Sequence, residues 1–136
     1  MTPPERLPPD DPREWLRRAR SNLALARSRP AGVDLEDLCF EAQQAAEKAV
    51  KALLVDRGLD VPRAHDLARL LSLLEDGAEV IPDEVRQAAE LTPYAVLGRY
   101  PGPMRPVTEE EYLWAVAIAE AVVRWAESRI GGGESG

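Results

Sequence analysis

Residues 34–57, DLEDLCFEAQQAAEKAVKALLVDR, contain no glycine or proline and are rich in strong helix formers such as Ala, Leu, Glu, Lys and Gln. Asp34 suits the position that caps such a helix at its N-terminus. With about 100° of rotation per residue, one stripe of this helix is apolar. The stripe consists of Leu35, Leu38, Cys39, Ala42, Ala46, Ala49, Val50 and Leu53. Because alanine dominates its middle, partner helices can approach closely, and we predict that this helix is the centre of the fold.

A second line of residues, Phe40, Gln44, Glu47 and Lys51, runs along a different face of the same helix. Glu47 and Lys51 stand four residues apart in the order that favours an ion pair on a helix. Together with Lys48 they form either an ordinary exposed ladder of charges or part of a binding surface. We look for function on this second face.

The composition limits the possible classes of protein. The 136 residues suit one domain with a real core, and the net charge of −7 argues against non-specific coating of nucleic acid or anionic membrane. Cys39 is the single cysteine, so no intramolecular disulfide can form, and we expect a small buried side chain there. No apolar run approaches the length of about 20 residues that spans a membrane, and no signal peptide opens the sequence. We therefore expect a cytoplasmic protein.

Periodicity and helix-terminating residues predict an all-α antiparallel bundle of four to five helices. No segment alternates with period two, so no sheet is expected. Residues 1–12 hold five prolines and are predicted to form a flexible arm, residues 13–130 the bundle, and residues 131–136 a disordered tail. Besides the central helix, helices are predicted over residues 12–28, 66–76, 82–91 and 108–130. The proline-rich residues 92–107 are predicted to be a loop.

The last predicted helix begins with the capping box Thr108-Glu-Glu-Glu and carries two apolar stripes. One contains Tyr112, Ala115, Val116, Ala119, Val122, Val123 and Ala126, and the other contains Trp114, Ile118, Ala121 and Trp125. Their combined arc is wider than a surface helix needs. Either the helix lies inside the bundle, or its second stripe packs on another subunit. We expect a homodimer or higher homo-oligomer, with Trp114, Ile118, Trp125 and Phe40 at the interface.

Several polar groups are candidates for chemistry, and each also has a structural interpretation. His65 is the only histidine. It stands at a helix start beside Asp66, where it is either an acid–base or phosphate-contacting group or part of the helix cap. The arginines of residues 13–29 either grip phosphate or balance the acidic remainder of the chain. Neither Cys nor His recurs at ligand spacing, so no metal site is predicted, and no nucleophilic triad can be identified.

The turn Arg99-Tyr100-Pro101-Gly102 combines a guanidinium and an aromatic ring in a constrained segment. Such a pair suits gripping and stacking on a nucleotide-like ligand. It suits a packed loop, with Arg99 bonded to a carboxylate, equally well. No phosphate-binding Gly-rich loop is present.

Taken in order, these segments resemble the HEPN domain, a small helical-bundle family, over residues 13–129. The resemblance rests on CFEAQQAAEKAVKALL (residues 39–54), on His65-Asp66-Leu67 and on Arg99-Tyr100-Pro101, followed by the Ala-rich last helix. It implies a dimeric bundle, often encoded beside a minimal nucleotidyltransferase in a toxin–antitoxin-like pair. It also implies nucleotide binding, for which the matching positions are Glu47, Lys51, His65, Arg99 and Tyr100. No cofactor is expected.

Some relatives in that family are metal-independent ribonucleases that use an Arg followed by a His after four to six residues. This sequence departs from the pattern, because one residue separates Arg63 from His65, seven separate Arg57 from it, and no His follows Arg99. We therefore expect a module with little or no catalytic activity. The alternatives are a ribonuclease toxin that uses Arg99 and His65, and a purely structural adaptor.

Overall fold

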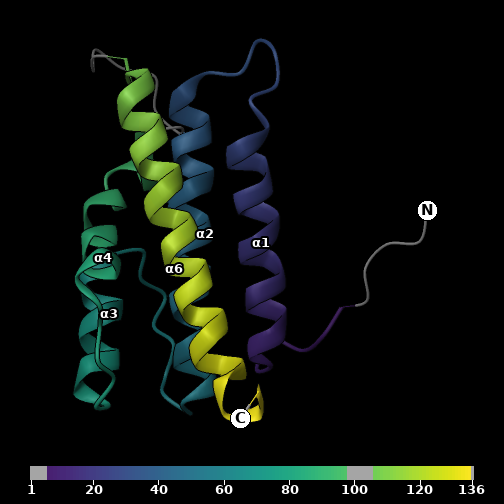
Figure 1. The fold of residues 1–136 in the computed structure, drawn as a ribbon, viewed down its shortest axis with the longest axis vertical. Coiled ribbons are helices and arrows are strands. Elements are labelled where there is room, and N and C mark those ends of the chain that lie inside the picture. Colours follow the sequence, from purple (N-terminus) through teal and green to yellow (C-terminus); the bar gives the residue numbers. More distant parts are fainter. Residues whose placement is uncertain (1–5, 98–105, 136) are drawn as a thin grey trace.

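The computed structural model describes residues 6–97 and 106–135, apart from the side chains of residues 96, 97 and 131–135. Three long helices, α1 (Pro12–Ser28), α2 (Leu35–Asp56) and α6 (Glu109–Ser135), lie side by side (Figure 1). The shorter elements are α3 (Leu67–Asp76), α4 (Asp83–Arg86), the 3-10 helix η1 (Gln87–Leu91) and α5 (Tyr94–Leu97). No strand occurs within the described ranges, and the predicted all-α bundle is confirmed.

The helix α2 is the centre of the fold, as the sequence predicts. It contacts α1, α3, α5, η1 and α6, and α1 runs in the opposite direction to α2 and α6 (Figure 1). The predicted stripe is buried except for the half-buried Leu35, and alanines at positions 42, 45, 46, 49 and 52 have no exposed surface. Such small side chains let neighbouring helices approach closely on several sides.

Local signals set the helix ends. The Asp11 side chain caps α1, and Pro12 occupies the first helical position. The helix α2 ends in a Schellman motif, because Gly58 adopts the left-handed φ of +71° and the N–H of Leu59 donates to the carbonyl of Leu54. At the start of α6 the predicted capping box forms, with bonds of 3.0 and 3.1 Å between Thr108 and Glu111.

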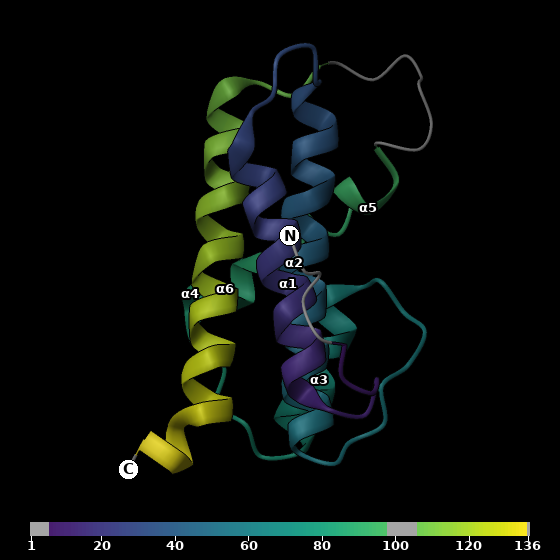
Figure 2. The same ribbon diagram turned by 90° about the vertical axis from the view of Figure 1, so that its right-hand side faces the viewer.

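Three segments differ from the prediction. Residues 92–107 are not a loop throughout, because the short helix α5 forms within them and lies beside α2 (Figure 2). The helix α6 continues past Ile130, where the sequence predicts its end, to Ser135. Residues 6–11 lie against the start of α1, since the indole Nε1 of Trp15 donates to the carbonyl of Pro9 at 2.7 Å and the N–H of Leu7 donates to Glu14.

The second apolar stripe of α6 is largely covered within the same chain. The helix contacts α4 and η1 in addition to α1 and α2. Ile118 is only 5% exposed, so its predicted place at a subunit interface is wrong: it belongs to the core. Trp114, Trp125 and Phe40 are half-buried and keep some surface. Among the described residues, no helix combines the length and the apolar character of a membrane span.

Candidate functional site

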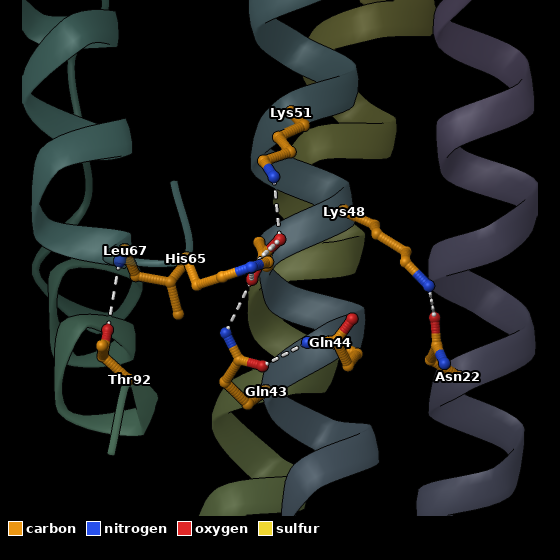
Figure 3. A network of polar contacts seen from close by, with 9 residues as sticks. Asn22, Gln43, Gln44, Lys48, Lys51, His65, Leu67 and Thr92 are labelled. Carbon is orange, nitrogen blue, oxygen red and sulfur yellow. Dashed lines mark hydrogen bonds and ion pairs between the residues drawn. The ribbon is translucent and has the colours of Figure 1, made fainter. Parts of the chain in front are cut away.

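A buried carboxylate on α2 gathers polar groups from α2 and from the segment before α3 (Figure 3). Glu47 accepts hydrogen bonds from the Nε2 of Gln43 at 2.9 Å and from the Nζ of Lys51 at 2.8 Å. Its two oxygens also lie 3.0 and 3.1 Å from the Nδ1 of His65. We call Gln43, Glu47, Lys51 and His65 the Glu47 cluster.

Part of the Glu47 cluster is buried and part of it is exposed to solvent. The side chains of Glu47 and Lys51 are only 4% and 7% exposed, whereas that of His65 is 57% exposed. The ammonium of Lys51 also lies 5.9 Å from the ring centre of Trp15, which adds a cation–π contact. No buried side-chain nitrogen or oxygen in the described part of the chain lacks a hydrogen-bond partner. The buried charges are therefore fully compensated from within the protein.

The electrostatics of Glu47 follow from these contacts. Burial alone would raise the pKa of this carboxyl, because a charge is poorly solvated inside the bundle. The hydrogen bonds from Lys51 and Gln43, the charge of Lys51 and the bond to His65 outweigh burial and hold the pKa below its ordinary value. Glu47 is accordingly an ionised acceptor at neutral pH.

His65 and Asp66, which precede α3, have different roles in the structure. The side chain of Asp66 caps the helix by accepting from the N–H of Ala68 at 3.0 Å. His65 instead turns toward α2 and the Glu47 cluster (Figure 3). With Nδ1 on the carboxylate, the ring can carry its proton on that nitrogen and present Nε2 to a ligand as an acceptor.

The structure brings three of the five predicted ligand-binding residues together, namely Glu47, Lys51 and His65. Arg99 and Tyr100 lie outside the described residues. The segment that leads to them begins near the cluster, because the hydroxyl of Thr92 accepts from the N–H of Leu67 at 3.1 Å (Figure 3). From there α5 follows and packs against α2.

Sequence analysis missed Gln43 and gave its place to Gln44. Residues 43, 47 and 51 are separated by four positions each, which is the spacing that places side chains on one line of a helix. That regular spacing is the signal that identifies Gln43. Gln44 stands outside this line and donates from its Nε2 to the Oε1 of Gln43 at 2.7 Å, which orients the Gln43 amide.

Groups of three or more His, Cys, Asp or Glu side chains that could hold a metal ion do not occur within residues 6–97 and 106–135. Cys39 is a fully buried side chain whose pKa is raised to about 12, chiefly by burial. The thiol is therefore protonated at neutral pH, and only the thiolate is a strong nucleophile.

Comparisons with known proteins agree with the all-α fold. A model of the HEPN domain family matches residues 12–129. The crystal structure of TT1696 from Thermus thermophilus superposes with a TM-score of 0.74 at 35% sequence identity, over 86% of this chain and 96% of that one. The structure of ST0689, described as an archaeal HEPN homologue, superposes with a TM-score of 0.70 at 29% identity, over 88% and 98% of the two chains.

A curated relative of different length also shares sequence with this chain. It is the ribosome maturation factor RimP of Frankia casuarinae, 36% identical over 107 residues. The match takes in 77% of this chain but only 36% of the Frankia protein, so the chain spans about a third of the length of that relative. The family match over most of the chain and the two similar structures show that the chain belongs to the HEPN domain family.

Proposed function

We propose that this HEPN module binds a nucleotide on the face of α2 that carries the Glu47 cluster. The observation that carries the proposal is the exposed ring of His65, which a buried carboxylate orients at 3.0 Å. A polar group fixed by buried partners is pre-organised for a ligand and loses little freedom on binding. Arg99 and Tyr100 are the candidates for the phosphate and base contacts, since a guanidinium suits phosphate and a ring suits stacking.

Isothermal titration with AMP, ATP and GTP tests the proposal. The variant His65→Ala should fold normally, because the ring is more than half exposed. It should weaken binding by about 10-fold, or about 1.4 kcal/mol, if His65 contacts the ligand. Arg124→Ala removes an exposed charge from α6 and is the control that should leave affinity unchanged. Absence of binding of all three nucleotides at about 1 mM would favour the structural adaptor instead.

The second proposal concerns assembly: a homodimer that also binds a minimal nucleotidyltransferase in a toxin–antitoxin-like pair. Trp114, Trp125 and Phe40 keep part of their aromatic surface exposed, and aromatic residues are enriched in interfaces. Light scattering should give twice the mass of one chain, and Trp125→Ala should lower it. A mass of one chain for the wild type contradicts the dimer. Co-purification from the native host tests the nucleotidyltransferase.

The contact between His65 and Glu47 also favours a ribonuclease as the alternative function. A carboxylate on Nδ1 is an arrangement that supports proton transfer through the other ring nitrogen. Incubation with RNA in EDTA separates the two functions, since metal-independent cleavage that His65→Ala abolishes would establish the ribonuclease. Intact RNA under these conditions leaves nucleotide binding as the better proposal.

A further inference from the structure

A cavity of about 210 Å³ lies between α1 and α2, on the other side of α2 from His65. Among the described residues, six line this α1–α2 pocket: Arg6, Arg17, Arg18, Ser21, Asn22 and Lys48. Four of the six are cationic and none is acidic, although the whole chain has a net charge of −7. The pocket is therefore a local concentration of positive charge on an acidic protein.

Two of these cations have carboxylate partners, and two do not. Arg17 pairs with Glu14 through bonds of 2.6 and 3.1 Å, and Arg6 lies 4.0 Å from the same carboxylate. Neither Arg18 nor Lys48 forms an ion pair with any residue that the structure describes. The Nζ of Lys48 donates instead to the neutral amide oxygen of Asn22 at 2.8 Å (Figure 3).

The electrostatic environment of Lys48 is unfavourable for its charge. Burial of the half-buried side chain lowers the pKa of its ammonium, and the charge of Arg18 lowers it further. The carboxylates of Glu41 and Glu47 act in the opposite direction without compensating, and Glu41 already accepts from the amide nitrogen of Asn22 at 2.6 Å. An anion in the pocket would offset this repulsion by attracting both cations.

We propose that the α1–α2 pocket binds the phosphate group of a phosphate monoester. A guanidinium fork and an ammonium suit the oxygens of such a dianion, and the hydroxyl of Ser21 adds a neutral donor. The volume of about 210 Å³ lies below the range of about 300–1,000 Å³ typical of sites that enclose whole small molecules. The pocket therefore holds the phosphate, and the rest of the ligand lies outside it.

This site differs from the proposed nucleotide site, because none of the lining residues belongs to the Glu47 cluster. Lys48 extends from α2 toward α1, whereas His65 approaches the opposite side of α2 from the segment before α3 (Figure 3). The phosphate proposal consequently stands whether or not His65 contacts a nucleotide. The variants Arg18→Gln and His65→Ala separate the two proposals.

The test measures binding of inorganic phosphate and of AMP to the full chain at low ionic strength, by isothermal titration and phosphorus NMR. Low salt is needed because exposed charges are screened. We expect a Kd of about 1 mM for both, the affinity of a few charge-assisted hydrogen bonds. Arg18→Gln should weaken both by about 10-fold. Because Arg18 is exposed, this variant should fold normally.

The matched control is Arg20→Gln, which removes the same charge from the same helix. Arg20 pairs with Glu127, away from the pocket, so the control should bind phosphate like the wild type. Phosphate should also raise the pKa of the Lys48 ammonium in NMR titrations, an effect that a merely structural role would not produce.

Three outcomes would overturn the proposal. The first is absence of phosphate binding at about 20 mM, well above the expected Kd. The second is equal affinity in Arg18→Gln and the wild type. The third is binding of an oligonucleotide with hydroxyl groups at both ends but of neither phosphate nor AMP, since this would assign the pocket to phosphodiesters of a nucleic-acid backbone.

Discussion

The charged side chains on the two sides of α2 differ in whether they have a partner of opposite charge. Toward α3, the carboxylate of Glu47 is met by Lys51, Gln43 and His65 within 3.1 Å, so each buried charge has a partner. Toward α1, the ammonium of Lys48 donates to the amide oxygen of Asn22 and forms no ion pair with any residue that the structure describes. Glu47 and Lys48 are adjacent in sequence, yet the first is compensated from within the protein and the second is not.

The difference separates structural polar groups from groups available to a ligand. A compensated buried charge fixes the positions of its neighbours, and in the Glu47 cluster only His65 extends to solvent. An uncompensated charge in a concavity keeps electrostatic attraction for a partner that is not part of the chain. The resemblance to the HEPN family suggests a ligand site at the Glu47 cluster. The positive charge and the shape of the α1–α2 pocket suggest a second ligand site there. The stability of the protein should respond differently to substitutions on the two sides.

The largest expected effect comes from removing the carboxylate. Glu47→Ala leaves the ammonium of Lys51, only 7% exposed, without its ion pair. Breaking a buried pair in this way costs about 3–5 kcal/mol of unfolding free energy. Urea denaturation followed by circular dichroism measures the change.

The control for this prediction is Glu127→Ala. Its carboxylate pairs with Arg20 at the surface, where about half of the Arg20 side chain is exposed, so the loss should stay below about 1 kcal/mol. Equal losses of unfolding free energy in the two variants would show that the Glu47 cluster stabilises the fold no more than a surface ion pair does. The contrast between the two sides of α2 would then fail.

Sequence analysis predicted the parts of this molecule that depend on local signals. The central helix, the start of α3 near Asp66 and the capping box at Thr108 each rest on residues within one or two turns. The contact of Glu47 with Lys51 also follows from helical spacing. The spacing predicted the pair but left its burial open, because burial depends on segments distant in sequence, such as Trp15 of α1 and His65 before α3.

The errors concern contacts between distant segments. Ile118 was placed at an interface because the combined stripes of α6 were too wide, and no pattern revealed that α4 and η1 would pack on that helix. The bond between Asn22 and Lys48 joins two helices and has no local signature. The sequence therefore did not predict the α1–α2 pocket. It indicated only that the arginines of residues 13–29 either bind phosphate or balance the acidic remainder of the chain.

A smaller effect is expected from changing the charge of Glu47 while keeping its shape. Glu47→Gln should lower the unfolding free energy by about 1–3 kcal/mol at neutral pH, because Lys51 loses a charged acceptor. The folded pKa of Glu47 lies below the ordinary value of 4.5, so its stabilisation is complete above that pH and is lost as pH falls through the folded pKa.

The measurement is the difference in unfolding free energy between wild type and Glu47→Gln across a pH series. It should be constant near neutral pH and shrink below about pH 4.5. Taking a difference removes the contribution of Glu14, whose pKa is lowered to about 2, chiefly by its bond from Arg17. A difference that grows on acidification would mean that burial of Glu47 outweighs its partners.

The smallest effect should come from the other side of α2. Lys48→Met removes a cation that Arg18 repels, at the expense of one bond to Asn22, so stability at pH 7 should change by less than about 1 kcal/mol. The folded pKa of Lys48 is below its ordinary 10.5, which means that the unfolded chain binds this proton more tightly. Wild type should therefore gain stability relative to Lys48→Met as pH rises from the folded pKa toward 10.5. This slope is opposite to that of a lysine held by a carboxylate, so a fall in relative stability would show that Lys48 is compensated and that the two sides of α2 are alike.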